Sequence, residues 1–352
     1  MNKNRLVRLF KRPSLLYLML GLLILASLPI SGVISSRHLS HQPSKPLIYV
    51  PRASYYKSLD LSLARQTIYS NQPIQQVSGL GLMNKVSVYT VRFEVPKDGL
   101  SEYGLMTLPS GTQPQGGYPV LILCHGYVNP HSYRTTAQYI QDMEFYSQHG
   151  FAVLKPDFRG QGLSYSDGTP DGAFYSMSYN TDVMSLIAAV KHTIYLNSGE
   201  ISIWGHSMGA YIALRAAVLS PDIKNVILLS APAGTAKDLF TQYRTLSDLD
   251  NPTALRVRNN ELALHGNPLS NPGFWESTSP LNYLKDTNAS FEINVGADDQ
   301  IVPPHFSTDL ATALAHAGKK YQYYVYPRGD HGLLAQRSLI WKRSLQLLED
   351  HK

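Results

Sequence analysis

The sequence contains a single cysteine, Cys124, and no clustered metal ligands. One thiol excludes an internal disulfide, and it excludes the thiolate clusters that bind structural zinc. The histidines stand singly, without the H-x-x-x-H spacing that places two of them on one face of a helix. We therefore predict that the protein works without a metal ion, and nothing in the sequence indicates another cofactor.

The part of the chain that should fold also lacks an excess of positive charge. Lys and Arg number 31 against 25 Asp and Glu, a formal net charge of +6. The basic residues from Lys3 to Arg12 precede the first acidic residue, Asp60, and the rest of the chain is close to neutral. Nucleic-acid binding requires basic residues clustered on the folded surface. The charge distribution therefore excludes nucleic acid as the main partner.

An uncharged segment follows the basic N-terminus. Residues 14–36, rich in Leu and Ile, are long enough as a helix to cross a hydrocarbon core about 30 Å thick. With a basic cytoplasmic tail at residues 1–13, the positive-inside rule predicts a transmembrane signal anchor and an extracytoplasmic position for the rest of the chain. The alternative is a cleaved signal peptide and a secreted protein, although Ser31–Val33 fits a small-x-small cleavage site poorly. Residues 37–85 are interpreted as a linker and an irregular N-terminal arm.

Two strand patterns follow the arm. Period-two alternation over Val86–Pro96 and Tyr103–Pro109 predicts an antiparallel hairpin. Six short apolar runs then alternate with segments of helical spacing. The runs are YPVLILCHG, GFAVLKPDF, ISIWGHS, NVILLSAP, SFEINVGADD and YQYYVYP, and the helical segments are Thr135–Gln148, Asn180–His192, Met208–Leu219, Pro304–Ala317 and Ser338–Glu349. This order predicts an α/β fold over residues 86–352, with a mostly parallel, doubly wound sheet and helices on both of its faces.

One segment interrupts the alternation. Residues 233 to about 281 lie between two predicted core strands, and they are more polar than the other connections, with several Pro and Gly. Ligands of such sheets bind at the carboxyl ends of the strands. We interpret the segment as an inserted cap over those ends.

The pentapeptide Gly205-His206-Ser207-Met208-Gly209 fits the pattern G-x-S-x-G. The short pattern is weak evidence alone, but here the apolar run ISIW precedes it and the helical segment YIALRAAVL follows it. A sharp turn from strand to helix needs glycine on either side, so that the serine is held strained and exposed. Ser207 is therefore the candidate nucleophile, with Gly205, His206 and Gly209 forming the turn. The competing interpretation is a serine that merely caps the helix.

A serine hydroxyl needs an adjacent base, and the base needs a group that orients it. The run FEINV leads into Asp298 and Asp299, and YQYYVYP leads into Asp330 and His331. Both pairs follow parallel strands, at the sheet edge where Ser207 is expected. His331 is the candidate base, and the order Ser, Asp, His is the one used by hydrolases with this turn.

These motifs resemble those of α/β hydrolases, over roughly residues 86–350. The stretches GYPVLILCHGY, KPDFRGQGLS, WGHSMG, GADDQIVP and GDHG are most similar to the catalytic domain of the prolyl oligopeptidase family. The resemblance implies that the triad acid is the first of the paired aspartates, Asp298 rather than Asp299. Members of that family also carry a β-propeller. Fewer than 90 residues precede the hydrolase domain here, so we expect none and assign substrate selection to the cap and the arm.

An oxyanion at the reacting carbon needs hydrogen-bond donors about 3 Å away. The backbone N–H of Met208, next after the nucleophile, is one candidate, and the backbone N–H of Tyr127, in the loop after YPVLILCHG, is the other. The family resemblance implies that the Tyr127 hydroxyl also binds the oxyanion; the competing interpretation is that this side chain packs under the cap and takes no part in the reaction. His125 is expected to brace this loop rather than to act as a base.

The predicted function is that of a serine hydrolase that acts through an acyl-enzyme. The family resemblance favours a serine peptidase that cleaves short peptides. A carboxylesterase uses the same groups and is the alternative. A non-enzymatic binding protein with a hydrolase fold is the alternative of another class. The sequence indicates no oligomeric state.

Overall fold

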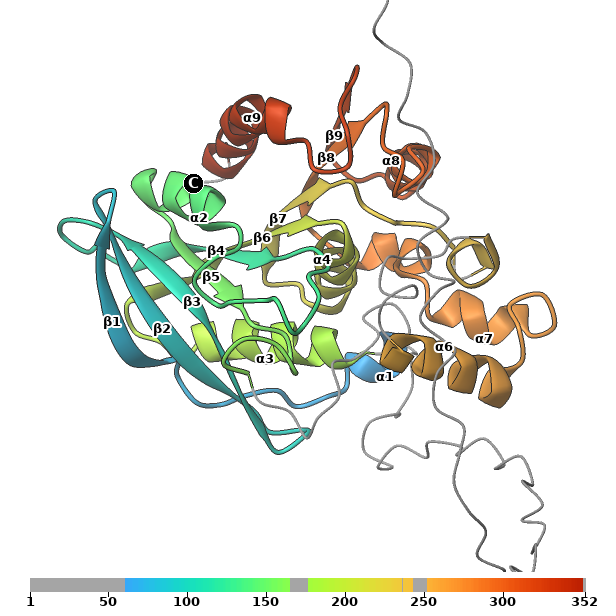
Figure 1. The fold of residues 1–352 in the computed structure, drawn as a ribbon, viewed down its shortest axis with the longest axis horizontal. Coiled ribbons are helices and arrows are strands. Elements are labelled where there is room, and N and C mark those ends of the chain that lie inside the picture. Colours follow the sequence, from blue (N-terminus) through green and yellow to red (C-terminus); the bar gives the residue numbers. More distant parts are fainter. Residues whose placement is uncertain (1–60, 165–176, 236, 243–251, 351–352) are drawn as a thin grey trace, which may run out of the picture. The chain divides into compact units, whose positions relative to one another are not determined.

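The apolar runs and helical segments assemble into one nine-stranded sheet with helices against it (Figure 1). The structure, a computed structural model, describes residues 61–164, 177–235, 237–242 and 252–350. The strands are Gln75–Met83 (β1), Val86–Val95 (β2), Leu100–Pro109 (β3), Tyr118–Cys124 (β4), Ala152–Pro156 (β5), Leu196–His206 (β6), Ile223–Leu229 (β7), Ser290–Gly296 (β8) and Tyr321–Tyr326 (β9). The helices are Leu61–Ala64 (α1), Ile140–Gln148 (α2), Ser178–Val190 (α3), Met208–Leu219 (α4), Pro252–His265 (α6), Pro272–Ser277 (α7), His305–His316 (α8) and Arg337–Glu349 (α9).

The strand order is β1-β2-β3-β5-β4-β6-β7-β8-β9. The first four strands in this order pair antiparallel, and every pair from β5 to β9 is parallel. The predicted hairpin is confirmed, since Val86 pairs with Pro109 and Val95 with Leu100. The sheet is therefore mixed, as expected for an α/β-hydrolase fold, and its parallel part places the carboxyl ends of β4, β6, β7, β8 and β9 along one edge.

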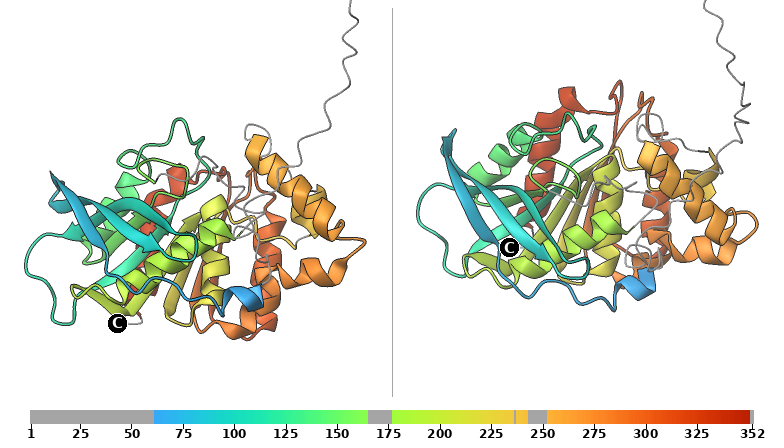
Figure 2. Two further views of the ribbon diagram at one scale, coloured as in Figure 1. Left: turned by 90° about the horizontal axis from the view of Figure 1, so that it is seen from below. Right: turned by 60° about the horizontal axis from the view of Figure 1, so that its bottom comes forward.

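The N-terminal arm contains a strand that was not predicted. β1 pairs with β2 and forms one edge of the sheet (Figures 1 and 2). Its residues are exposed on both faces, apart from a half-buried Met83. A strand with no buried face needs no alternation of apolar and polar residues, so its sequence lacks the pattern that reveals the other strands.

Helices cover the sheet on both faces, and alternate residues of one strand belong to two different cores. Val120, Ile122 and Cys124 of β4 pack in a cluster with side chains of α3, α4 and α8. Leu121 and Leu123, on the opposite face, pack with side chains of α2 and α9. Burying one such aliphatic side chain stabilises the fold by about 1.5–3 kcal/mol. The central strands are thus held rigidly, which positions the loops at their ends.

Helix α2 begins at Ile140, later than the predicted Thr135. Lys155 donates to the carbonyl oxygens of Thr135 (2.8 Å) and Gln138 (3.0 Å), which would otherwise accept helical hydrogen bonds. Tyr139, just before the helix, has a left-handed backbone with φ +61°. The Lys155 side chain of β5 therefore competes with the helix for these carbonyl oxygens.

The segment between β7 and β8 is mainly helical where it is described. It contains a π-helix at Asp238–Gln242, helices α6 and α7, and a 3₁₀ helix at Pro280–Asp286. Figure 2 shows α6 and α7 together at one side of the sheet, on the side away from β1. Phe240 packs on Trp275 with ring centroids 4.2 Å apart, and both side chains belong to the same core cluster as the central strands, so this part of the segment packs against the rest of the domain.

None of the helices in the described ranges is long and apolar enough to span a membrane. The predicted cytoplasmic tail, the predicted anchor and the linker up to residue 60 lie outside those ranges.

Candidate active site

Ser207 lies at the sharp turn between β6 and α4. Its backbone, with φ 53° and ψ −122°, is strained for a residue with a side chain. The flanking glycines are required by close packing: a Cβ on Gly209 would lie 2.0 Å from the carbonyl oxygen of Cys124, and one on Gly205 would lie 2.4 Å from the carbonyl oxygen of Gly209. The turn therefore has the conformation of a nucleophile elbow, with its serine at the N-terminus of a helix.

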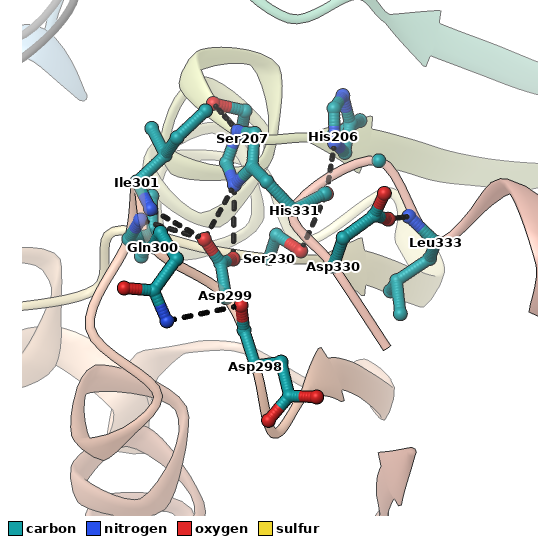
Figure 3. A network of polar contacts seen from close by, with 12 residues as sticks. His206, Ser207, Ser230, Asp298, Asp299, Gln300, Ile301, Asp330, His331 and Leu333 are labelled. Carbon is teal, nitrogen blue, oxygen red and sulfur yellow. Dashed lines mark hydrogen bonds and ion pairs between the residues drawn. The ribbon is translucent and has the colours of Figure 1, made fainter. Parts of the chain in front are cut away.

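His331 lies next to this serine, although 124 positions separate them in the sequence. The loop after β9 carries the histidine to the carboxyl edge of the sheet, and Nε2 of His331 is 2.9 Å from Oγ of Ser207 (Figure 3). The serine hydroxyl can therefore donate its proton to this nitrogen, and Nδ1 must carry the other ring hydrogen. Two donors hold the backbone carbonyl of His331: Oγ of Ser230 and Nε2 of His206, each at 2.9 Å.

The carboxylate beside His331 belongs to Asp299, which corrects the prediction of Asp298. Nδ1 of His331 lies 2.9 Å and 3.1 Å from the two carboxylate oxygens of Asp299. Asp299 also accepts the backbone N–H groups of Ile301 and Val302, each at 2.9 Å. Burial alone raises the pKa of Asp299, but the hydrogen bond from His331 and the two N–H groups outweigh it and hold the pKa below its ordinary value. Asp299 is therefore ionised at neutral pH.

Asp298 is exposed and points away from the imidazole (Figure 3). Its backbone N–H donates to the carbonyl of Gly329, so the turn after β8 is tied to the loop that carries His331. The two aspartates differ by one position and lie on opposite sides of this turn. The Asp299 side chain accepts N–H groups two and three residues ahead, a common arrangement for aspartate in a turn. Asp298 has residues at the same spacing, so the local sequence does not distinguish the two.

The two candidate oxyanion donors are carried by neighbouring segments. Met208 is the first residue of α4, so its N–H has no acceptor within the helix. Tyr127 follows β4 by three positions, and its side chain is partly buried against the main core. A Cβ on Gly126 would lie 3.3 Å from the carbonyl oxygen of His206, so the loop of Tyr127 packs directly against the elbow.

Other polar residues of the motifs have structural partners. His125 is fully buried, hydrogen-bonds the carbonyl of Gly126 through Nδ1 at 2.7 Å, and stacks on Tyr133. Burial lowers the pKa of His125 to about 3, so this histidine is neutral and braces the loop as expected. Arg159 forms buried ion pairs with Asp98 and Asp182, which ties the loop after β5 to the hairpin and to α3.

Asp330, adjacent to the base, turns away from it. Its carboxylate accepts the backbone N–H of Leu333 at 2.9 Å. In the part of the chain that the structure describes, no group of three His, Cys, Asp or Glu side chains is placed to hold a metal ion.

Comparison with known proteins identifies the family. The prolyl oligopeptidase family matches residues 137–349, which is more than half of the chain and includes Ser207, Asp299 and His331. Among solved structures, the acetyl xylan esterase from Paenibacillus sp. R4 is similar, with a TM-score of 0.61 and 19% identity over 85% of this chain and 96% of that one.

Two peptidases have the same fold. A putative dipeptidyl aminopeptidase IV from Bacteroides ovatus matches with a TM-score of 0.58 and 14% identity over 75% of this chain and 36% of that one. The acylaminoacyl peptidase of Pyrococcus horikoshii matches with a TM-score of 0.58 and 16% identity over 80% of this chain and 50% of that one. The match thus spans half or less of each peptidase, and at these identities the likeness shows the fold alone. The family match and the elbow that it contains identify this chain as a serine hydrolase that belongs to the prolyl oligopeptidase family.

Proposed function

We propose that the protein is a serine peptidase that cleaves short peptides through an acyl-enzyme. The observation that carries the proposal is the continuous contact from Asp299 through His331 to the strained Ser207, with each gap near 2.9 Å. Oγ of Ser207 attacks the carbonyl carbon while Nε2 of His331 takes its proton, and the imidazolium returns that proton to the leaving amine. Water then repeats the sequence on the acyl-enzyme and releases the acid.

Electrostatics supports this assignment of roles. The ionised Asp299 stabilises the imidazolium that forms during each proton transfer. Negative charge develops on the carbonyl oxygen beside the N-terminus of α4, where the helix dipole and the N–H of Met208 favour it. We assign the second donor to the N–H of Tyr127, on the loop that packs against the elbow.

The proposal is tested with a fluorophosphonate probe on the full-length protein. We expect covalent labelling at Ser207, identified by peptide mass, and no labelling of the Ser207→Ala variant. Matched series of short peptide amides and of short-chain to long-chain acyl esters then give kcat/KM for the two substrate classes. Turnover of the peptides is the expected result. Labelling at another residue, or no labelling at all, would contradict the mechanism.

A carboxylesterase is the second candidate. The acetyl xylan esterase matches along 96% of its own length, so a protein of this architecture needs no large additional domain to be an esterase. In either case we propose that the segment from residue 233 to about 281 acts as the cap that selects the substrate. Its described part lines a hollow of about 380 Å³ with Thr235, Leu269, Trp275 and Glu276 among the lining residues.

Tyr127 separates the two candidates. Family resemblance assigns its hydroxyl to the oxyanion in peptidases, whereas most esterases of this fold use only the backbone N–H at this position. If the protein is a peptidase, Tyr127→Phe should lower kcat by about 10²-fold with little change in KM, because a donor that acts only in the transition state is lost. Steady-state kinetics on one good substrate measures both constants. An unchanged kcat would favour an esterase with a backbone-only oxyanion hole.

We also propose that residues 14–36 anchor the protein in the membrane, with the catalytic domain on the extracytoplasmic side. The basic residues before the segment and the lack of charge within it support this orientation. Full-length protein should remain with the membrane fraction after an alkaline wash. External protease should cleave after Arg37 in intact, wall-stripped cells. A mature form in the medium that begins near residue 32 would show that the segment is a cleaved signal.

A further inference from the structure

A chain of hydrogen bonds connects the loop of Tyr127 to the loop of His331. The backbone N–H of Gly126 donates to the hydroxyl of Tyr139 at 2.9 Å, and that hydroxyl lies 2.8 Å from Nδ1 of His206. Nε2 of His206 lies 2.9 Å from the carbonyl oxygen of His331. His206 immediately precedes the nucleophile, so the chain joins three separate parts of the site.

The direction of each bond follows from the groups at its two ends. The carbonyl of His331 can only accept, so Nε2 of His206 carries the hydrogen and Nδ1 is a bare acceptor. The Tyr139 hydroxyl accepts from Gly126 and donates its own hydrogen to that Nδ1. The Tyr139 hydroxyl and the two ring nitrogens of His206 thus each have a defined donor or acceptor role. Only one placement of their hydrogens satisfies all three bonds.

Tyr139 and His206 keep these donor and acceptor roles over the whole working range of pH. Burial raises the pKa of the Tyr139 phenol to about 12 and lowers the pKa of His206 to about 3. Other charges that face His206 are those of His331, Arg337 and Asp299, and those facing Tyr139 are Arg337 and Asp142. A neutral phenol and a neutral imidazole therefore form the chain.

Backbone strain is concentrated around this chain. Among the described residues, seven that are not glycine have a positive φ, and Tyr139, Ser207, Ser230 and Leu333 are four of them. Strained residues persist where surrounding contacts hold them, and they cluster at functional sites. Gly126 is closely packed against both side chains of the hydrogen-bonded chain. A Cβ at this position would lie 2.8 Å from the Tyr139 hydroxyl and 2.9 Å from Nδ1 of His206.

We propose that Tyr139 and His206 are positioning residues, whose hydrogen-bonded chain sets the oxyanion loop and the base loop at the correct distance from Ser207. The inference rests on the proposed serine mechanism, in which His331 takes the proton of Ser207 while the N–H of Tyr127 donates to the oxygen of the carbonyl group that Ser207 attacks. Neither Tyr139 nor His206 exchanges a proton with the substrate. Their effect is on geometry, and a displacement of about 1 Å in a catalytic group can lower the rate about 10²-fold.

The test removes one side-chain polar group of the hydrogen-bonded chain at a time. Tyr139→Phe retains the ring and deletes the hydroxyl, so it should lower kcat by about 10-fold with KM little changed. His206→Leu breaks both links and should lower kcat by about 10²-fold. His206→Gln can still donate to the carbonyl of His331 and should recover a large part of that loss. The rate of fluorophosphonate labelling should fall in the same order, because it uses the same base and oxyanion site.

Tyr133→Phe is the matched control. Tyr133 is buried near the same loop, but its hydroxyl donates to Asp157 at 2.8 Å and takes no part in the chain. This variant should lower the Tm and leave kcat within about twofold of the wild type, because the loss of one buried hydrogen bond affects mainly stability. Circular dichroism and Tm of every variant establish that kinetics are compared between folded proteins.

Two outcomes would overturn the inference. One is a folded Tyr139→Phe protein with the kcat of the wild type, and the other is an equal loss of kcat in His206→Gln and His206→Leu. If His206→Leu does not fold, the Tyr139→Phe protein decides alone. Failure of the wild type to react with fluorophosphonate would instead contradict the proposed mechanism itself, so the two failures are distinguishable.

Discussion

Ser207→Ala and His331→Ala should each lower kcat by about 10⁴-fold or more while the protein stays folded. The serine forms the covalent bond and the histidine moves the proton in the same step, so removing either one abolishes that step. For the same reason the double variant should be no slower than either single variant. Single-turnover kinetics on an activated ester and on a peptide amide would measure the loss.

Ser220→Ala provides the control for the serine. Ser220 lies just past the C-terminal end of α4, the helix that begins after Ser207, and it is almost fully buried. Its substitution should leave kcat unchanged. A Ser207→Ala protein that is folded and retains more than about a tenth of the wild-type kcat would exclude Ser207 as the nucleophile.

Asp299→Ala should lower kcat almost as far, by about 10⁴-fold, whereas Asp298→Ala should change it by less than about threefold. Asp299 contacts Nδ1 of His331 and selects the ring tautomer that leaves Nε2 free to accept the serine proton. Without it, the imidazole loses both its orientation and the charge that stabilises its protonated form. Asp298 is exposed and is held in the turn only through its backbone.

The pair of adjacent aspartates makes this comparison well controlled, because both variants remove a carboxylate from the same turn. Asp299→Asn adds a third measurement: the amide has nearly the same shape, but it can present a donor to Nδ1 and so favour the wrong tautomer. It should therefore be nearly as slow as Asp299→Ala. Equal losses at positions 298 and 299, or a larger loss at 298, would contradict the assignment of the acid.

The local sequence was sufficient to predict most of the fold. Strands β4 to β8 carry runs of apolar residues because helices bury them on both faces, and such runs are visible in the sequence. Helix α4 begins and ends at the predicted residues, Met208 and Leu219. Strand β1 was missed because an exposed edge strand has no buried face to leave a pattern, and the start of α2 was misplaced because Lys155, from another strand, takes the carbonyl oxygens of the first turn.

In the active site, too, some features follow from neighbouring residues and others depend on contacts between distant segments. The sequence by itself determined that Ser207 stands at a strand-to-helix turn and that His331 follows a later parallel strand, since both facts depend on neighbouring residues and on the order of strands. Only the tertiary structure decided between Asp298 and Asp299, because a single step along a turn reverses the side on which a carboxylate lies. It also decided the partners of Tyr139 and His206, whose bonds join segments that are 67 and 125 positions apart. Contacts over such separations depend on how the sheet brings its loops together, and no local pattern of residues encodes them.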